Sequence, residues 1–406
     1  MKKNITYLSI FLGGIIVAIL MFSIVRYSPE YMYRILRYRD SDVNDYKIFP
    51  EKIIQSSIEP YYYESEIMDG LGEEVVHYRY NGEDRKEKLN IFLENTKTTS
   101  FIVIHNDKVV FEQYYNGYSR DSINTSFSSV KSIVSLLIGI AIDEGFIKNE
   151  KQSIAEYIHE FKNTPMEEIT IEDLLMMRSK IRYKEGSLWF GDDAKTYYMP
   201  NLRELAMDHI RIDKEYQGNF LYNNYHPLLL GIILERSTGQ RVSSFLEEKL
   251  WKKIGSEYDA SWSLDSHKNE FEKMESGLNF CSIDFAKIGS MLLHMGKWNG
   301  EDIISEDWIY KSTIAEFPLE EQEYKNTFLE NTGAGYQYMW YSIEKKQGAY
   351  DYFAAGKHGQ FLYVSPQNNI VILRNGIESG KVDWWPNVLE NITQNVVELT
   401  YEGRRI

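Results

Sequence analysis

The sequence has very little cysteine: Cys281 is the only one among 406 residues, so no intrachain disulfide can form. We expect this thiol to pack as a small apolar side chain rather than to act as a nucleophile. The eight histidines form neither an H-x-H nor an H-E-x-x-H pattern, so local spacing indicates no metal site. Long basic runs are lacking too, and 60 acidic against 45 basic residues give a net charge of −15. Phosphate backbones need a positive protein surface, which excludes nucleic acid as an expected partner.

One long uncharged run is present near the N-terminus. Residues 5–25, "ITYLSIFLGGIIVAILMFSIV", follow Lys2 and Lys3 and contain no charged side chain. A helix of this length spans the ~30 Å hydrocarbon core of a bilayer at ~1.5 Å rise per residue. No A-x-A-like cleavage site follows, which favours a retained anchor over a cleaved signal peptide. Four arginines between residues 26 and 39 compete with the two lysines, so the charge count leaves the orientation open.

The remainder of the chain is typical of a folded protein, with 43% hydrophobic and 26% charged residues and no internal repeat. Residues 1–27 are predicted to form the membrane anchor. Residues 28–95, rich in tyrosine and charge, are predicted to be a juxtamembrane segment, with a small packed cap as the alternative. Residues 96–406 are predicted to form the folded domain.

The apolar periodicity of that domain predicts strands at both ends and helices between them. Residues 101–117 indicate a β-hairpin, and residues 336–376 alternate with period two, as antiparallel strands do. Residues 386–400 predict a closing helix. Helical spacing fills the middle, in stretches that run over 127–145, 170–177, 226–240, 243–255, 282–296 and 305–316. We therefore predict an α/β (α+β) fold, an antiparallel sheet flanked by helices, with a mostly helical insertion at about residues 146–330.

A lysine stands at the start of one apolar helix. In "FSSVKSIVSLLIGIAIDEG" (127–145), Lys131 is followed by no charged side chain until Asp143. Ser128 lies three residues before it, so on a helix the two side chains share a face. A serine hydroxyl needs a proton acceptor to become a nucleophile. An ammonium removed from water loses its preference for the charged form, so a buried lysine can take that role. The alternative is a structural lysine that extends its amine from the helix end to water.

The S-x-x-K spacing is not specific by itself. Ser342 and Lys345 repeat it within "WYSIEKKQG", in a strand-like context that we interpret as a solvated edge. Two further motifs follow Ser128 in order, however. Tyr222 and Asn224 precede the apolar helix, and "AAGKHGQFLYVSP" places K-x-G beside a strand.

The ordered set S-x-x-K, Y-x-N and K-x-G resembles the penicillin-recognising serine hydrolases, a family of β-lactamase/transpeptidase-like fold. Within that family the sequence is most similar to class C β-lactamases, D-alanyl-D-alanine carboxypeptidases and related esterases and amidases. The resemblance covers residues 98–400 and implies that Ser128 is the nucleophile and Lys131 the base. It also implies that Tyr222 relays a proton to the leaving group, and it leaves open which of the two takes the first proton.

The same resemblance implies a set of substrate contacts. Asn224 is expected to hydrogen-bond the substrate's amide or carbonyl, and Gly359 to leave room for a substrate backbone against the strand. The backbone N–H groups of Ser128 and Gln360 are expected to form the oxyanion hole. Lys357 and His358 complete the predicted substrate-binding residues.

The sequence departs from the family pattern at several positions. His358 replaces the hydroxyl of K-T-G that helps to hold a β-lactam carboxylate, and its role is open between structure, substrate contact and proton transfer. Gln360 after the glycine is more similar to the esterase and amide-oligomer hydrolase branch. Lys180 stands where relatives usually carry glycine, and the S-D-N element and glutamate base of class A enzymes have no evident counterpart. We therefore expect little β-lactamase activity. The aromatic stretch 183–199 is predicted to wall the pocket or to cover the helical core.

The function predicted from these patterns is a single-pass membrane-anchored serine hydrolase. It would cleave an ester or amide, in a small molecule, a peptide or a cell-wall fragment, and the chemistry requires no cofactor or metal. Relatives act outside the cytoplasm, which implies an extracytoplasmic catalytic domain. The alternatives are a non-catalytic peptidoglycan- or peptide-binding module on the same fold, a D-Ala-D-Ala carboxypeptidase, or a weak β-lactamase.

Overall fold

The computed structural model describes residue 14 and residues 26–403, except 187, 214, 216–217, 316–322 and 346–347. Apart from residue 14, the predicted membrane span at residues 5–25 lies outside the described part of the chain. Within the described part, none of the helices is both long and apolar enough to cross a bilayer.

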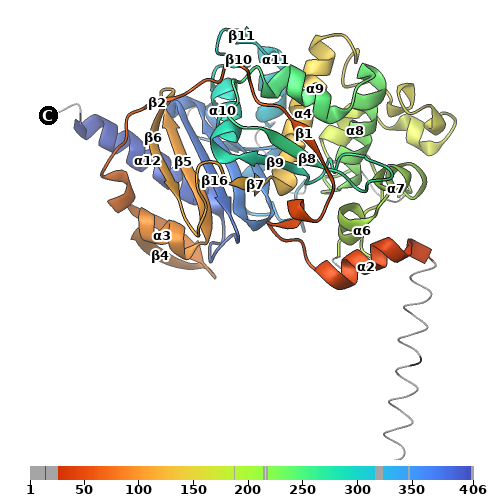
Figure 1. The fold of residues 1–406 in the computed structure, drawn as a ribbon, viewed down its shortest axis with the longest axis horizontal. Helices are drawn as coiled ribbons and strands as arrows, with labels where there is room; N and C mark the ends of the chain where they lie inside the picture. The colour runs from red at the N-terminus through yellow and green to blue at the C-terminus, as the bar shows by residue number, and fades with distance from the viewer. Residues whose placement is uncertain are drawn as a thin grey trace, which may run out of the picture.

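An eight-stranded sheet forms one side of the molecule and is built from both ends of the chain (Figure 1). In spatial order its strands are β12 (Ala334–Gln337), β13 (Trp340–Glu344), β14 (Tyr350–Gly356), β15 (Gln360–Ser365), β16 (Ile370–Gly376), β5 (Thr98–His105), β6 (Lys108–Tyr114) and β2 (Glu64–Ser65). Neighbours are antiparallel except β2, which runs parallel to β6. The predicted N-terminal hairpin and the period-two strands are thus confirmed, and β16 joins the two ends by pairing with β5.

Helices cover both faces of this sheet, which is why β16 is buried along its whole length and β5 at every residue except His105. α10 (Ser282–Leu293) packs on one face, where Gly289 brings its backbone close to Val371 of β16. α12 (Trp385–Gly403) packs on the other face, where the Trp385 ring lies 6.1 Å from that of Phe361. The predicted closing helix is therefore confirmed, and it extends to Gly403.

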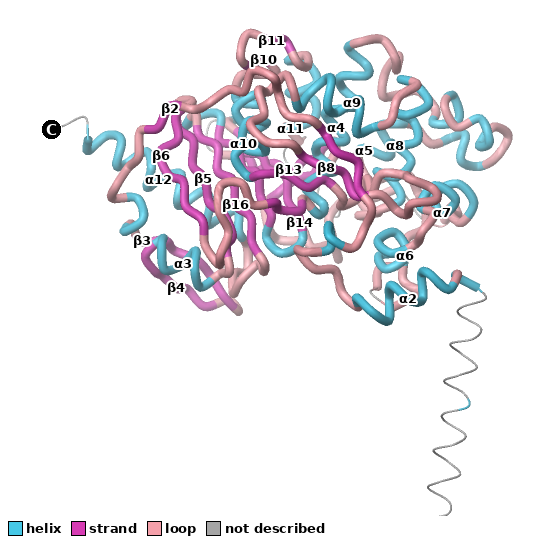
Figure 2. The backbone as a smooth tube through the Cα atoms, viewed as in Figure 1, coloured by secondary structure: helices cyan, strands magenta, loops and turns pink. Residues whose placement is uncertain are grey.

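A second, four-stranded antiparallel sheet lies between the large sheet and the helical region (Figure 2). Its order is β1 (Glu51–Ile54), β8 (Ala260–Ser263), β9 (Leu278–Cys281) and β7 (Ile123–Thr125). The sequence pattern missed it: β8 and β9 fall in the insertion predicted as mostly helical, and each is four residues long and buried throughout, so neither alternates. β7 leads directly into the turn that holds Ser128, so this sheet positions the predicted nucleophile.

The helical region surrounds α4 (Val130–Asp143), which packs against α8 (Tyr225–Thr238). The sequence signals for its helix ends are confirmed. A capping box between Thr170 and Asp173 starts α5 (Ile171–Leu175), and Gly239, with φ of 70°, ends α8 in the left-handed conformation. The other helices and strands of the body are α6 (Asp192–Tyr198), α7 (Leu202–Asp208), α9 (Val242–Leu246), α11 (Glu306–Thr313), β10 (Lys297–Trp298) and β11 (Glu301–Asp302).

The stretch 28–95 is folded against the body. It contributes β1 and β2 to the two sheets and contains α2 (Pro29–Tyr38), β3 (Val75–Tyr80), β4 (Glu83–Lys88) and α3 (Leu89–Asn95). The β3–β4 hairpin contacts α12, and α2 contacts α6. These residues therefore form an integral layer of the same body.

Two local predictions need correction. The stretch 336–344 is two strands rather than one, because Tyr338 and Met339 adopt positive φ and turn the chain between β12 and β13. The second S-x-x-K is not a solvated edge: Ser342 is buried, and its hydroxyl accepts a hydrogen bond from the Ala315 N–H at 3.1 Å. Cys281 is buried as predicted, and burial raises the pKa of its thiol to about 12.

Candidate active site

The turn before α4 presents Ser128 to a pocket. After β7 the chain passes through a 3-10 turn, Phe127–Ser129, in which Phe127 has a φ of 45°. A left-handed conformation is costly for a bulky residue and is held by its surroundings. Here the N–H and hydroxyl of Ser129 donate to the Ser126 carbonyl at 3.2 and 2.8 Å. Ser128 is thereby left half-exposed among buried neighbours.

Lys131 points at the hydroxyl of Ser128. Its Nζ lies 2.8 Å from Ser128 Oγ and 3.1 Å from the carbonyl oxygen of Glu275, and the residue is 1% exposed. The structure thus brings the predicted nucleophile and base into hydrogen-bonding contact. Both partners are uncharged oxygen atoms, a hydroxyl and a backbone carbonyl.

The ring of Tyr222 also lies against the Lys131 amine. Lys131 Nζ lies 4.8 Å from the centre of its ring, within cation–π distance. The ring packs edge-on against Phe328, and the side chain hydrogen-bonds that of Tyr341. Burial, and then the neighbouring Tyr222 and Tyr336, keep the pKa of Tyr341 well above its usual value, so Tyr341 stays protonated. The structure places Tyr222 at the site, and its proton relay stays a prediction.

A cavity of about 380 Å³ opens beside Ser128. Three other predicted residues line it with Ser128: Tyr222, Asn224 and Lys357. The aromatic stretch 183–199 contributes α6, whose Asp193, Ala194, Tyr197 and Tyr198 form a wall, so its predicted place near the pocket is confirmed. The remaining lining residues are Arg39, Asp40, Ser41, Phe127, Glu275 and Ser276.

Asn224 lines this cavity and is held in place by hydrogen bonds of its side-chain amide. Its Nδ2 donates to Tyr183 Oη at 2.9 Å and to Thr196 Oγ1 at 3.3 Å. Both hydroxyls already donate elsewhere, Tyr183 to Asp193 and Thr196 to the Asp192 carbonyl, which fixes the orientation of the amide. Asn224 Oδ1 is buried and accepts no hydrogen bond from the described residues.

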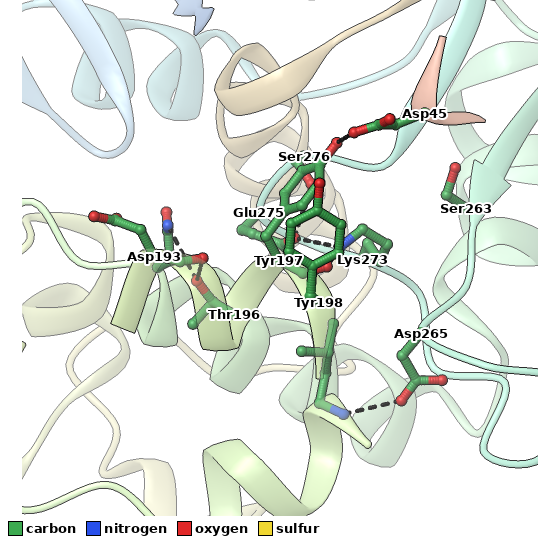
Figure 3. Close-up of polar contacts among 12 residues, drawn as sticks. Asp45, Asp193, Thr196, Tyr197, Tyr198, Ser263, Asp265, Lys273, Glu275 and Ser276 are labelled. Atoms are coloured by element: carbon green, nitrogen blue, oxygen red, sulfur yellow. Dashed lines mark hydrogen bonds and ion pairs between the residues drawn. The ribbon is translucent and has the colours of Figure 1, made fainter. Parts of the chain in front are cut away.

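A buried ion pair supports the carbonyl that contacts Lys131. Lys273 Nζ lies 3.0 Å from Glu275 Oε1 and donates to the Tyr197 carbonyl at 2.5 Å (Figure 3). The amine lies between the rings of Phe49 and Tyr197, 4.6 and 4.3 Å from their centres. Burial lowers the pKa of Lys273, and Glu275 opposes that shift. The pair thus ties the α6 wall to the base. Sequence reasoning missed it, since "FEKMESG" (271–277) matches no motif.

The K-H-G turn between β14 and β15 faces the N-terminal layer. Lys357 Nζ lies 2.6 Å from Asp40 Oδ1 and donates to Ser41 Oγ at 2.8 Å. His358, at φ of 64°, hydrogen-bonds through Nε2 to the Ser41 carbonyl at 3.0 Å, and its ring is 5.0 Å from that of Phe127. Burial lowers the pKa of His358. Of the three roles left open for His358, the structure supports a contact that holds residue 41.

Gly359 and the Gln360 side chain both pack against residues of β16 in the large sheet. A Cβ on Gly359 would lie 2.0 Å from Arg374 Nη1, and its φ is 78°. The Gln360 side chain is 2% exposed; its Nε2 donates to the Gly376 carbonyl at 2.7 Å and its Oε1 accepts from Asn375 Nδ2 at 2.8 Å. The Gln360 side chain is therefore not free to contact a substrate, and the oxyanion role of its backbone N–H stays a prediction. Among the described residues, no group of three or more His, Cys, Asp or Glu is placed to hold a metal ion.

Comparison with known proteins identifies the family. Residues 92–374, well over half of the chain, match the family model described as Beta-lactamase. The chain belongs to the beta-lactamase family. Its resemblance to penicillin-recognising serine hydrolases is thereby confirmed, and the family supports a serine hydrolase; the catalytic roles of Ser128 and Lys131 stay predictions.

Three similar proteins show how far the likeness extends. A 6-aminohexanoate-dimer hydrolase of Paenarthrobacter ureafaciens is 26% identical over 317 residues, 73% of this chain and 74% of its own. A Bacillus anthracis protein assigned to the 6-aminohexanoate-dimer hydrolases superposes with a TM-score of 0.71 at 22% identity, covering 91% of this chain and 95% of its own. A penicillin-binding protein homologue from Pyrococcus abyssi gives 0.57 at 18% identity, over 74% of each chain. The two structures share the fold with this chain.

Proposed function

We propose that this chain hydrolyses an amide or ester through an acyl-enzyme on Ser128. The observation that carries the proposal is the 2.8 Å contact between Lys131 Nζ and Ser128 Oγ at the edge of a cavity. A cavity of ~300–1,000 Å³ suits a small ligand, and the 380 Å³ found here lies within that range.

The chemistry follows from the positions of these groups. Lys131 or Tyr222 takes the hydroxyl proton while Ser128 Oγ attacks the substrate carbonyl carbon. The backbone N–H groups of Ser128 and Gln360 stabilise the oxyanion, each by ~3 kcal/mol as in comparable acyl transfers. The held proton then passes to the departing amine or alcohol as its bond to carbon breaks. Water attacks the carbonyl carbon of the resulting ester and loses a proton to the same base. The bond from that carbon to Ser128 Oγ then breaks as Oγ takes the proton back, which releases the carboxylic acid and restores the serine.

An amide is the preferred substrate. Asn224 lines the cavity, and the oxygen of a side-chain amide accepts a hydrogen bond from an amide N–H but not from an ester oxygen. The Paenarthrobacter relative is named for the hydrolysis of an amide, the dimer of 6-aminohexanoate. We therefore propose a short amide of an amino acid as substrate class, with activated esters as faster artificial substrates.

The proposed location is the outer face of the cell membrane, with a single span at residues 5–25. The uncharged run of that stretch and the two preceding lysines support this. Carbonate extraction of membranes, followed by protease treatment of intact cells, tests it. A protein that leaves the membrane with carbonate would contradict the anchor.

A fluorophosphonate probe tests the proposed nucleophile. We expect an adduct on Ser128 by peptide mass mapping, and loss of labelling together with a fall in ester turnover of at least about 1,000-fold in Ser128→Ala and Lys131→Ala. Ser342→Ala, in the second S-x-x-K, is the matched control and should keep the label. A folded but unlabelled protein would instead support the non-catalytic binding module.

A substrate panel separates the enzymatic alternatives. We expect turnover of short p-nitrophenyl esters and of amino acid amide dimers, and slow or absent turnover of nitrocefin. Release of D-alanine from D-Ala-D-Ala peptides at a rate above that of the dimers would favour a carboxypeptidase, and rapid nitrocefin hydrolysis a β-lactamase.

A further inference from the structure

The segment between α2 and the 3-10 turn Asp45–Lys47 crosses the pocket beside the K-H-G turn. We call residues 39–44 the strap. Its Asp40 carboxylate and Ser41 hydroxyl both contact the Lys357 ammonium, at 2.6 and 2.8 Å. A lysine that faces a pocket is otherwise a binding point for a substrate carboxylate. In this chain, the Asp40 carboxylate occupies that binding position on Lys357.

The strap is held at both ends by buried contacts. On its α2 side, Arg34 donates to the carbonyls of Tyr198 and Asp265, at 3.1 and 2.7 Å. On the other side, the Tyr197 hydroxyl donates to Asp45 Oδ2 at 2.8 Å. Position 40 is therefore fixed relative to the α6 wall by the fold. The Asp40–Lys357 pair does not have to hold the strap in place.

The ion pair itself contributes little stability. The side chains of Asp40 and Lys357 are 71% and 45% exposed, and pairs this exposed are typically worth ~0–1 kcal/mol. Its main effect is on the net charge at this end of the pocket, where a ligand would bind. Desolvation acts to raise the pKa of the Asp40 carboxyl, but the hydrogen bond and charge of Lys357 hold it below its usual value. Asp40 is thus ionised at neutral pH and cancels the charge of Lys357.

Other charged groups also line the pocket. Asp193 adds a carboxylate and Arg39 a guanidinium, while the Glu275 carboxylate is already paired with Lys273. A substrate carboxylate placed near Lys357 would meet Asp40 at contact distance, and like charges so close repel.

We propose that Asp40 is a specificity-determining residue, which makes the site select substrates that carry no carboxylate next to Lys357. The inference rests on the proposed hydrolase function and names the substrate class further: an acyl group without a carboxylate on the side of the K-H-G turn. Removal of the Asp40 charge should open a carboxylate-binding position at Lys357.

A matched pair of esters tests this in the full-length protein. p-Nitrophenyl pentanoate and mono-p-nitrophenyl glutarate have acyl groups of the same length, which end in a methyl group and a carboxylate. In Asp40→Asn, we expect the ratio of kcat/KM for the glutarate ester over that for the pentanoate ester to rise about 10-fold, through a lower KM, and the gain to shrink in high salt. The added substitution Lys357→Met should remove the gain.

Asp42→Asn is the control, because it removes the same charge from the strap at a position that does not line the pocket. Its ratio should equal that of the unaltered protein. An unchanged ratio in Asp40→Asn, or an equal rise in both variants, would overturn the proposal.

Direct binding tests the proposal without turnover. By calorimetry, we expect glutarate to bind Asp40→Asn at least about 10-fold more tightly than the unaltered protein. Equal affinity would overturn the role of Asp40. Failure of the proposed hydrolase function would show separately, as absence of pentanoate turnover and of Ser128 labelling in the unaltered protein.

Discussion

Gly359 shows at the scale of one residue why the third motif contains glycine. Its φ of 78° is a conformation that side chains rarely adopt, and the guanidinium of Arg374 fills the space where a Cβ would lie. Arg374 is fully buried and donates to the carbonyls of Gly359 and Thr96, at 2.5 and 2.8 Å. Its guanidinium also lies 4.1 Å from the centre of the Trp385 ring. A buried arginine thus holds the turn that carries Lys357.

Gly359→Ala should therefore destabilise the protein and lower turnover. Gly300→Ala is the matched control, since Gly300 has a φ of 80° but open space where a Cβ would lie. Left-handed strain alone costs about 1–2 kcal/mol, and we expect Gly300→Ala to show that loss in urea unfolding with activity retained. Gly359→Ala should lose clearly more, since Arg374 must move. Equal losses in the two variants would contradict the packing role.

At the scale of elements, the start of α8 holds the Tyr222–Asn224 motif against the loop after α5. His226 is fully buried, and its Nε2 hydrogen-bonds Ser179 Oγ at 2.6 Å. Asn223 Nδ2 donates to the Ile181 carbonyl at 2.9 Å. Lys180 in this loop has a φ of 64°, which explains why glycine is usual there. The motif is therefore positioned by a buried polar contact that the Y-x-N spacing does not reveal.

Burial of His226 makes the free energy of unfolding depend on pH. Burial lowers the pKa of His226 from its usual 6.5 to about 3, so between these values the unfolded chain binds a proton that the folded one does not. The free energy of unfolding should fall as pH falls from 6.5, by about 1.4 kcal/mol per pH unit from this group. Denaturant unfolding between pH 4.5 and 6 should show a shallower slope in His226→Gln. His209→Gln, at an exposed position, should leave the slope unchanged.

At the scale of the whole molecule, the layer formed by residues 28–95 is part of the core. Ile54, Leu71, Val76, Leu89 and Phe92 from this layer are fully buried in the main hydrophobic cluster. Each such side chain contributes ~1.5–3 kcal/mol on burial. Their sum is comparable to the ~5–15 kcal/mol stability of a typical domain.

Deletion of residues 1–95 should therefore prevent folding, although the family match begins at residue 92. Deletion of residues 1–25 should leave the body folded, because the buried side chains described for this layer begin at Tyr31. Circular dichroism and limited proteolysis of both truncated proteins check this. A cooperative thermal transition in the protein that lacks residues 1–95 would contradict the integral role of the layer.

The predictions from sequence that the structure confirmed depend on local patterns. The three-residue spacing of Ser128 and Lys131, the capping box at Thr170 and the stop at Gly239 depend on the geometry of one helix, which a short stretch of sequence specifies. Period-two strands and the order of the three motifs were read in the same way. The buried sheet of β8 and β9 was missed because strands buried on both faces do not alternate.

The sequence by itself determined that a serine and a lysine meet on one helical turn, since neighbours along a helix are set by its pitch. Only the tertiary structure decided what surrounds them: the Glu275 carbonyl at Lys131, and Asp40 at Lys357. These partners lie 144 and 317 residues apart along the chain. Contacts at such separations depend on how the layers pack, which no local spacing encodes.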